Sequence, residues 1–194
     1  MYMTAAMTGL RQGELLALRW ADVDWGAQRI RVRQNFVRGQ FGSPKSKRST
    51  RSVPLADALG GELDRLHQRS EYNADSDLVF CHPHTGHPME RSRLLKRYKA
   101  ALKRGGVREV RFHDLRHTFG TRMAAAGVPM RTLQEWMGHR DFKTTLIYSD
   151  YQPGANEAQL VNAAFGSSTN SSTILSETGN NSDASNPMDE RDRT

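Results

Sequence analysis

Across much of this chain, apolar residues recur three or four positions apart, the spacing that places side chains on one face of an α-helix. Leucines at this spacing predict a helix over residues 56–69. The same pattern predicts further helices over residues 1–7, 11–19, 91–104, 114–126 and 142–148, and from Pro129 onward. Gly127 is expected to end the helix before it, and Asp141 is expected to cap the last one.

Three short segments instead alternate between polar and apolar residues, which is typical of half-buried β-strands. They lie over residues 29–33, around 36–41 and over 51–55. The pattern as a whole therefore predicts a chain that is mostly α-helical with a small amount of strand, and the expected fold class is α+β.

The composition changes near the C-terminus. From Ser167 onward, 15 of 28 residues are Ser, Thr or Asn, and such a segment has too few apolar side chains to offset the entropy lost on ordering. Residues 155–165 have the pattern of one more amphipathic helix. We therefore expect a folded domain over residues 1–166 and a disordered polar tail over residues 167–194.

The formal net charge of +7 is unevenly distributed, because residues 1–150 carry +11 and residues 151–194 carry −4. A body that basic suits a polyanionic partner such as DNA, although charge alone also fits a merely solvated surface. The single cysteine, Cys81, cannot form an internal disulfide, and the chain has no signal peptide and no long apolar run. We expect a cytoplasmic protein that does not contact a membrane.

Cys81 begins the segment Cys-His-Pro-His-Thr-Gly-His, which contains several side chains that could bind a metal. The spacing of these side chains matches no zinc pattern, and Pro83 and Gly86 indicate a turn. We therefore expect no metal site.

The candidate chemistry centres on His113, Arg116 and His117. These residues are three and four positions apart, so on a helix they share a face and direct their hydrogen-bond donors at one place, an arrangement that suits an anion. His139 follows 23 residues after Arg116, and Tyr148 follows nine residues later. A phenol near a cationic pocket is expected to deprotonate more easily than its reference pKa of about 10 suggests. This pattern predicts a tyrosine nucleophile directed at a phosphate.

The same residues carry a family resemblance. The segments His-Asp-Leu-Arg-His at 113–117, Gly-His at 138–139 and Thr-Thr-Leu-Ile-Tyr-Ser at 144–149 resemble the second motif block of the tyrosine recombinases, the phage-integrase family. Residues 8–15, Thr-Gly-Leu-Arg-Gln-Gly-Glu-Leu, are similar to the first block. The resemblance covers roughly residues 4–151. It implies the catalytic domain of a tyrosine recombinase, mostly α-helical, with a small three-stranded antiparallel sheet.

The resemblance implies a site-specific DNA recombinase that cuts and rejoins DNA through a 3′-phosphotyrosyl link to Tyr148, with no metal and no cofactor. Arg11 and Arg116 would contact the non-bridging phosphate oxygens. The family places a lysine on a β-hairpin between the two blocks, and Lys45 is expected to be this residue and to protonate the leaving 5′-oxygen. Lys47 is the alternative, because the register of the hairpin could slip by two residues.

The remaining residues of the implied site assist. His113 and His139 would add hydrogen-bond donors, and His113 would also help to remove the proton of Tyr148. Glu14 is expected to orient Arg11, and His117 is treated as a supporting residue. Tyr151 is a less favoured nucleophile than Tyr148, because one helical turn carries it past the pocket.

Double-stranded DNA is the expected partner, contacted through cations of the lysine-rich loop and of the helix over residues 91–104. The residues concerned are Lys47, Arg48, Arg93, Lys96, Arg97, Lys103 and Arg104. By resemblance, the active form is expected to be a homotetramer on paired recombination sites. The apolar face of the helix over residues 155–165 is expected either to pack against a neighbouring subunit or to fold back onto its own.

Family members usually carry an N-terminal DNA-binding domain ahead of the region matched here, so we expect a catalytic-domain fragment or a naturally shortened gene product. One alternative is a shortened remnant that binds DNA or partner subunits without cutting. Another is a type IB topoisomerase, although the Leu-Arg-His and Gly-His spacings fit integrases better.

Overall fold

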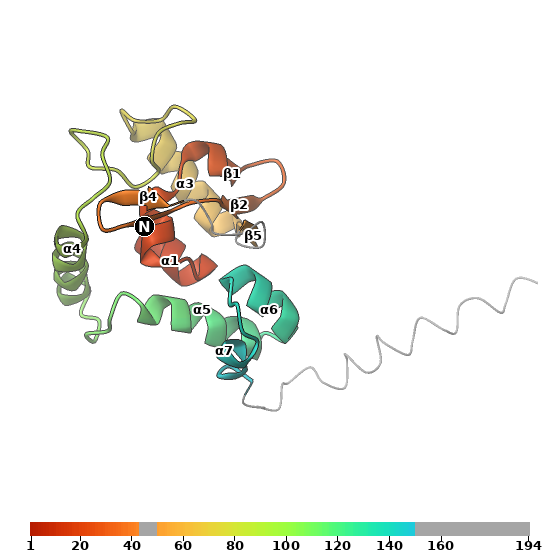
Figure 1. Ribbon diagram of the computed structural model, residues 1–194. Helices are drawn as coiled ribbons and strands as arrows, with labels where there is room; N and C mark the ends of the chain where they lie inside the picture. The colour runs from red at the N-terminus through yellow and green to blue at the C-terminus, as the bar shows by residue number, and fades with distance from the viewer. Residues whose placement is uncertain (43–49, 150–194) are drawn as a thin grey trace, which may run out of the picture. The chain divides into compact units, whose positions relative to one another are not determined.

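Helices make up most of the regular structure in the computed structural model, which describes residues 1–42 and 50–149 (Figure 1). The helices are α1 (Tyr2–Thr8), α2 (Gln12–Ala17), α3 (Asp57–Arg69), α4 (Arg91–Arg104), α5 (Asp114–Ala125), α6 (Met130–Met137) and α7 (Lys143–Leu146), with a short 3-10 helix η1 (Trp20–Asp22). The strands are β1 (Val23–Asp24), β2 (Arg29–Val32), β3 (Asn35–Val37), β4 (Gln40–Gly42) and β5 (Arg51–Pro54). The predicted α+β class with mostly helix is confirmed.

Several predicted features lie outside the described residues. They are Lys45, Lys47 and Arg48 in the segment 43–49, and Tyr151, the helix over 155–165 and the polar tail in the segment 150–194. The predicted domain boundary at residue 166 therefore stays a prediction.

The predicted three-stranded antiparallel sheet is present, but the prediction that the segment around 36–41 is one of its strands is wrong. Its strands are β1, β2 and β5 in that order, with Ile30 of β2 opposite Val53 of β5. The segment around 36–41 forms a separate hairpin from β3 and β4. Both residues of its turn, Arg38 and Gly39, have positive φ, 52° and 79°, which is the conformation of a tight two-residue hairpin turn.

Most of the predicted helices are found close to their expected positions. The helix over residues 91–104 is confirmed residue for residue, and Gly127 follows α5 with φ of 78° as expected for a residue that ends a helix. The helix predicted over 11–19 stops earlier, at Ala17. Leu18 is extended, and its carbonyl accepts a hydrogen bond from Val79 N at 2.8 Å, so this backbone pairs with a distant segment instead of continuing the helix.

The last predicted helix is also shorter than expected. Helix α7 ends at Leu146, which leaves Tyr148 in the turn that follows. Phe142 and not Asp141 occupies the N-cap position, but the Asp141 carboxylate accepts a hydrogen bond from Lys143 N, at the first residue of this helix, at 3.0 Å.

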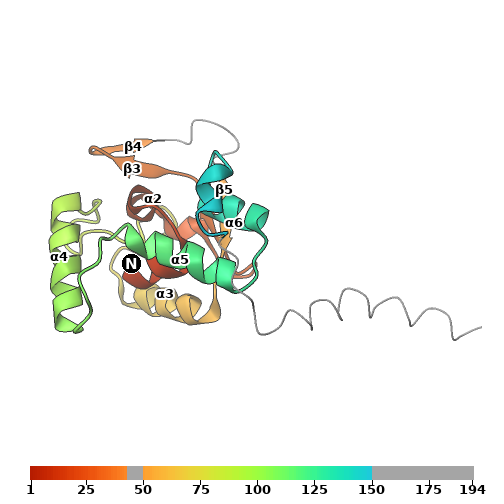
Figure 2. The same ribbon diagram turned by 90° about the horizontal axis from the view of Figure 1, so that it is seen from below.

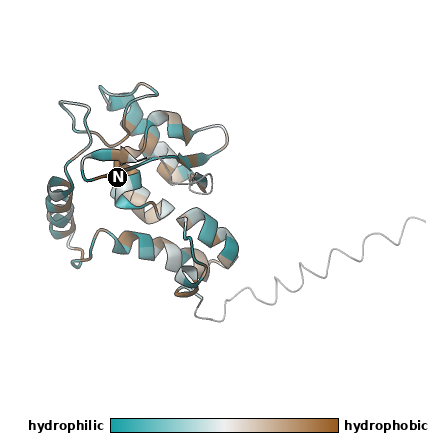
Figure 3. Cartoon of the chain, in the orientation of Figure 1, coloured by the Kyte–Doolittle hydropathy of each residue, from teal (hydrophilic) through white to brown (hydrophobic). Residues whose placement is uncertain are grey.

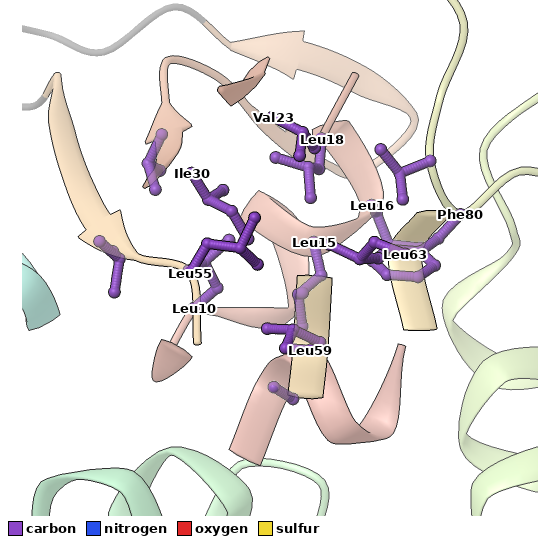
Figure 4. Packing of buried hydrophobic residues seen from close by; sticks show 14 of the residues in the cluster. Leu10, Leu15, Leu16, Leu18, Val23, Ile30, Leu55, Leu59, Leu63 and Phe80 are labelled. Atoms are coloured by element: carbon purple, nitrogen blue, oxygen red, sulfur yellow. The ribbon is translucent and has the colours of Figure 1, made fainter. Parts of the chain in front are cut away.

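Leucine and other aliphatic side chains from α2, the three-stranded sheet and α3 converge in one core (Figure 4). Leu15 of α2 and Ile30 of β2 are fully buried, and Leu59 of α3 is 1% exposed. Because these residues are tightly packed, the start of α2, where Arg11 lies, is held on a rigid base.

Helix α5 packs against α1 and α6, and α6 in turn packs against α7 and β5, so α5 links the elements that carry the two motif blocks (Figures 1 and 2). At Gly9, the C-terminal end of α1 approaches α5 so closely that a Cβ atom would lie 2.5 Å from Phe119 Cδ1. Within residues 1–42 and 50–149, no helix has both the length and the apolar composition needed to cross a membrane.

Candidate active site

Arg11 stands at the N-terminus of α2, where its side chain is 44% exposed. Its backbone N donates to Glu14 Oε2 at 2.8 Å, and its Nη1 donates to Glu14 Oε1 at 3.1 Å. Its Nη2 donates to the carbonyl oxygen of Gly138, at the end of α6, at 2.9 Å. Glu14 and the end of α6 thus hold the Arg11 guanidinium in place.

Glu14 has a second arginine partner, Arg51, that the sequence analysis missed. The two terminal nitrogens of Arg51 donate to both oxygens of the Glu14 carboxylate, at 2.9 and 2.8 Å. The Arg51 and Glu14 side chains are only 7% and 9% exposed. Burial on its own would raise the pKa of the Glu14 carboxyl, but Arg51 and Arg11 together hold this pKa below its ordinary value. Glu14 is therefore a carboxylate at neutral pH.

The alternation of residues around Arg51 could have indicated that this arginine is buried. Arg51, Val53 and Leu55 occupy alternate positions of one strand segment, so they share a face, and Val53 and Leu55 are buried. A buried arginine requires an acceptor, and a carboxylate is the best one.

Arg116 lies on the buried side of α5 and is 4% exposed. Its guanidinium donates to the carbonyl oxygens of Gly9 and Met137, at the C-terminal ends of α1 and α6. Helix C-termini carry partial negative charge, which favours a cation there. Burial, together with the charge of Arg11, lowers the pKa of Arg116 to about 10, so the group stays charged at neutral pH.

His139 follows Gly138, which ends α6 in the left-handed conformation with φ of 61°. Its backbone is fixed by Gln134, whose carbonyl accepts from His139 N and whose side-chain amide donates to His139 O, both at 3.1 Å. The ring Nδ1 lies 2.9 Å from Thr145 Oγ1. Burial, followed by the charges of Arg116 and Arg11, lowers the pKa of His139 to about 4, so the imidazole is neutral at pH 7.

Tyr148 lies in the turn after α7, with its hydroxyl 2.9 Å from His117 Nδ1. Its ring packs against α5 at Gly120, where a Cβ atom would be 2.5 Å from Tyr148 Cζ. Gly120 is one turn beyond His117, so one face of α5 holds both the hydroxyl and the ring of the tyrosine.

The expectation that Tyr148 deprotonates easily is wrong. Burial raises the pKa of its phenol, and the charge of Arg116 offsets this only in part. The cost of burying the charged phenolate thus outweighs the attraction of the neighbouring cation. The phenol is protonated at neutral pH.

The three motif residues of α5 do not act at one point. Arg116 is directed inward, His117 contacts Tyr148, and His113 is exposed at the start of the helix. The His113 ring packs edge-on against His117 with 5.3 Å between ring centroids. Burial, then the charges of His117 and Arg116, lower the pKa of His113. The Tyr148 hydroxyl is thus hydrogen-bonded to His117 Nδ1, whereas the sequence analysis assigned the removal of its proton to His113.

Helix α4 presents a surface of exposed cations, and most of this helix is coloured hydrophilic in Figure 3. Its buried side holds Leu94 and Tyr98. We call the exposed set the α4 basic face; its members are Arg93, Lys96, Arg97, Lys103 and Arg104. Elsewhere in the described part of the chain, no group of three or more His, Cys, Asp or Glu residues could hold a metal ion.

Comparison with known proteins gives a consistent family. Residues 1–154 match the model of the phage integrase family. The chain is 33% identical over 192 residues to a XerC-like tyrosine recombinase of Caldanaerobacter subterraneus subsp. tengcongensis, covering 85% of this chain and 49% of that protein. It is 28% identical to the prophage integrase IntR of Escherichia coli, covering 80% of this chain and 44% of that protein. The chain thus spans about half the length of these relatives.

Solved structures agree with this assignment. The XerA recombinase is 28% identical, with a TM-score of 0.62, over 83% of this chain and 54% of that one. The Tn1549 transposon integrase in complex with circular intermediate DNA has a TM-score of 0.64 at 24% identity, over 84% of this chain and 58% of that one, and supports the fold alone. With a family model that matches most of its length, the chain belongs to the phage integrase family.

Proposed function

We propose that this chain is the catalytic domain of a site-specific DNA recombinase, which cuts and rejoins double-stranded DNA through a 3′-phosphotyrosyl intermediate. The observation that carries the proposal is the hydrogen bond between Tyr148 Oη and His117 Nδ1, 2.9 Å long, beside the buried guanidinium of Arg116. A nucleophile in contact with a base, next to a fixed cation, is the arrangement that phosphoryl transfer requires.

In the proposed reaction, Tyr148 Oη attacks the scissile phosphorus and the 5′-oxygen leaves. The Tyr148 proton passes to His117, which is needed because burial raises the pKa of the phenol. Arg11 and Arg116 stabilise the negative charge on the non-bridging oxygens, since each guanidinium has more N–H donors than its protein partners accept.

His139 contributes as a neutral hydrogen-bond donor. When the hydroxyl of Thr145 donates to Nδ1, the single proton of the neutral ring is on Nε2 and can be donated to a phosphate oxygen. Lys45, which lies outside the described residues, is proposed to protonate the leaving 5′-oxygen. The phosphotyrosyl bond retains the energy of the broken phosphodiester, so rejoining needs no nucleotide cofactor.

The proposed substrate also determines the expected partners. The α4 basic face and the loop cations Lys47 and Arg48 would contact phosphates without reading sequence. Related recombinases have been solved with DNA, among them the XerH recombinase bound to its difH substrate. We propose that this chain acts as a homotetramer on paired recombination sites, in the cytoplasm where such DNA is found.

A covalent-trapping assay tests the proposal. Wild-type protein and Tyr148→Phe are incubated with a pool of nicked duplexes of random sequence, in which the cleaved fragment diffuses away and leaves the adduct trapped. We expect a DNA–protein adduct that survives denaturing electrophoresis for wild type and none for Tyr148→Phe, at equal DNA binding. Wild-type protein that binds DNA but forms no adduct would favour the non-cutting remnant.

A further inference from the structure

Arg51 lies inside the candidate active site but has no place in the proposed reaction. It begins strand β5, and its side chain is 7% exposed. Two of its guanidinium nitrogens donate to the Glu14 carboxylate at 2.9 and 2.8 Å, and its Nε donates to the carbonyl oxygen of Trp136 at 2.8 Å. Every nitrogen of the guanidinium thus has an acceptor within the protein, which leaves Arg51 one orientation and makes a direct contact with DNA unnecessary.

The carboxylate of Glu14 joins Arg51 to Arg11. Each of its two oxygens accepts one hydrogen bond from Arg51 and one from Arg11, so that both groups share the same acceptor. A carboxylate that accepts from two sides cannot rotate without breaking bonds on both. The two hydrogen bonds from Arg51 therefore fix the orientation of the Glu14 carboxylate, and this orientation determines where Arg11 is held.

The end of helix α6 ties the same two arginines together a second time. The carbonyl of Trp136 accepts from Arg51, and the carbonyl of Gly138 accepts from Arg11 at 2.9 Å. A Cβ atom at Gly138 would lie 2.9 Å from Arg51 Cζ, so the lack of a side chain there makes room for the guanidinium. Arg51 and Arg11 thus share one carboxylate and one helix terminus, whereas Arg11 alone is exposed.

We propose that Arg51 is a positioning residue, which fixes Glu14 and, through Glu14, the guanidinium of Arg11 that meets the scissile phosphate. This inference rests on the proposed function, because it concerns the placement of a group that contacts the substrate. The competing explanation is that the buried pair only stabilises the fold.

Three variants, together with a double-mutant cycle between Arg51 and Arg11, separate these explanations. Arg51→Met removes one partner of a buried ion pair, which is usually strongly destabilising. The charge-free pair Glu14→Met/Arg51→Met removes both charges and keeps apolar side chains of similar length, an exchange that is often tolerated. Arg33→Met is the matched control, because Arg33 follows β2 of the same sheet and its Nε donates to the buried carboxylate of Asp22, with no hydrogen bond to Glu14 or Arg11.

Cleavage is measured in single turnovers at saturating DNA, on substrate whose bridging 5′-oxygen is replaced by sulfur so that slow variants stay measurable. We expect the charge-free pair, with a Tm near that of wild type, to cleave about 10–100-fold more slowly, because a small misplacement of a catalytic group costs that much. Its Kd for DNA should change less than about twofold, and Arg33→Met should cleave at about the wild-type rate. A charge-free pair that cleaves like wild type would leave Arg51 with a stabilising role only.

A double-mutant cycle asks whether Arg51 acts through Arg11. In an Arg11→Lys background, Arg51→Met should slow cleavage by less than about threefold, because the group that it positions is already gone. If Arg51→Met slowed cleavage by the same factor with Arg11 and with Lys at position 11, the two residues would act independently. That result would contradict the inference.

A probe that needs no cleavage completes the test. Orthovanadate mimics the trigonal-bipyramidal phosphoryl transition state, and its binding can be followed by vanadium NMR. We expect binding to wild type and to Arg33→Met, and binding about 10-fold weaker to the charge-free pair. Equal binding by all three would overturn the role of Arg51. Failure of wild type to form a DNA adduct would instead overturn the proposed function.

Discussion

The cations of this chain occur in two contrasting regions. In the active site, Arg51 and Arg116 are buried and donate to a carboxylate or to carbonyl oxygens. On the α4 basic face, the cations are exposed, and no carboxylate of the described residues lies within ion-pair distance of Lys96 or Arg97. The first arrangement fixes geometry, and the second supplies attraction at long range. Substitutions in the first region should therefore change rate and stability, and substitutions in the second should change affinity and its dependence on salt.

Arg116→Ala should have the largest effect. It removes a cation from the phosphate site and leaves two buried helix-end carbonyls, of Gly9 and Met137, without a donor. We expect adduct formation to fall by at least about 1,000-fold and the free energy of unfolding to fall by about 3 kcal/mol. Urea unfolding and the trapping assay measure both quantities. Arg97→Ala is the control, for which a loss of similar size would erase the contrast between the two regions.

Gly120→Ala should disturb the tyrosine alone. The added methyl would lie 2.5 Å from Tyr148 Cζ, so the ring must move and the hydrogen bond to His117 must lengthen. We expect cleavage about 10–100-fold slower at nearly unchanged DNA affinity. Gly60→Ala in α3 is the matched control, because the nearest atom to its new methyl is 3.8 Å away. Equal rates for both variants would mean that the ring does not depend on α5 for its position.

Lys96→Gln/Arg97→Gln should act in the opposite way. We expect DNA binding about 10-fold weaker at low salt, and the slope of log K against log salt should become shallower by about 2, since two phosphate contacts release fewer counterions. Cleavage at saturating DNA should stay within about twofold of wild type. An unchanged salt slope, read from titrations at several salt concentrations, would show that these cations do not contact phosphates.

The smallest expected effect concerns pH. The pKa of His139 is about 4 in the folded protein and 6.5 ordinarily, so between these values the unfolded chain binds more protons at this residue. Stability therefore falls as pH decreases from about 6.5 to about 4 and changes no further below that range. In His139→Gln this contribution is absent, so the difference in Tm between wild type and variant should shrink on acidification. A constant difference between pH 7 and pH 4 would contradict the assigned pKa.

Local patterns in the sequence were enough to place most of the helices of the described residues, although not the ends of α2 and α7. Helix α4 is found at Arg91–Arg104 as expected, because its apolar and charged residues separate cleanly onto two faces. The segment 36–41 was misread, because alternation over so few residues fits one strand or a tight hairpin equally well. The positive φ of Arg38, a residue that seldom adopts it, has no signature in the hydrophobic pattern.

The candidate site was predictable only as far as its residues fall into two short blocks. Arg51 was missed because its partner Glu14 is 37 residues away, and the contact depends on the placement of β5 against α2. The pKa of Tyr148 was predicted in the wrong direction, because it depends on the balance of burial against charge. The spacing of residues in the sequence indicates which charged groups lie near Tyr148. It does not indicate which partners those groups bind or how deeply the phenol is buried.

Locating the covalent bond tests the central proposal most directly. The trapped DNA adduct is digested with nuclease and protease, and mass spectrometry then identifies the residue that retains a phosphonucleotide. We predict that this residue is Tyr148 and that Tyr151→Phe is still modified at Tyr148. A phosphonucleotide on Tyr151, or on any residue other than Tyr148, would contradict the assignment of Tyr148 as the nucleophile.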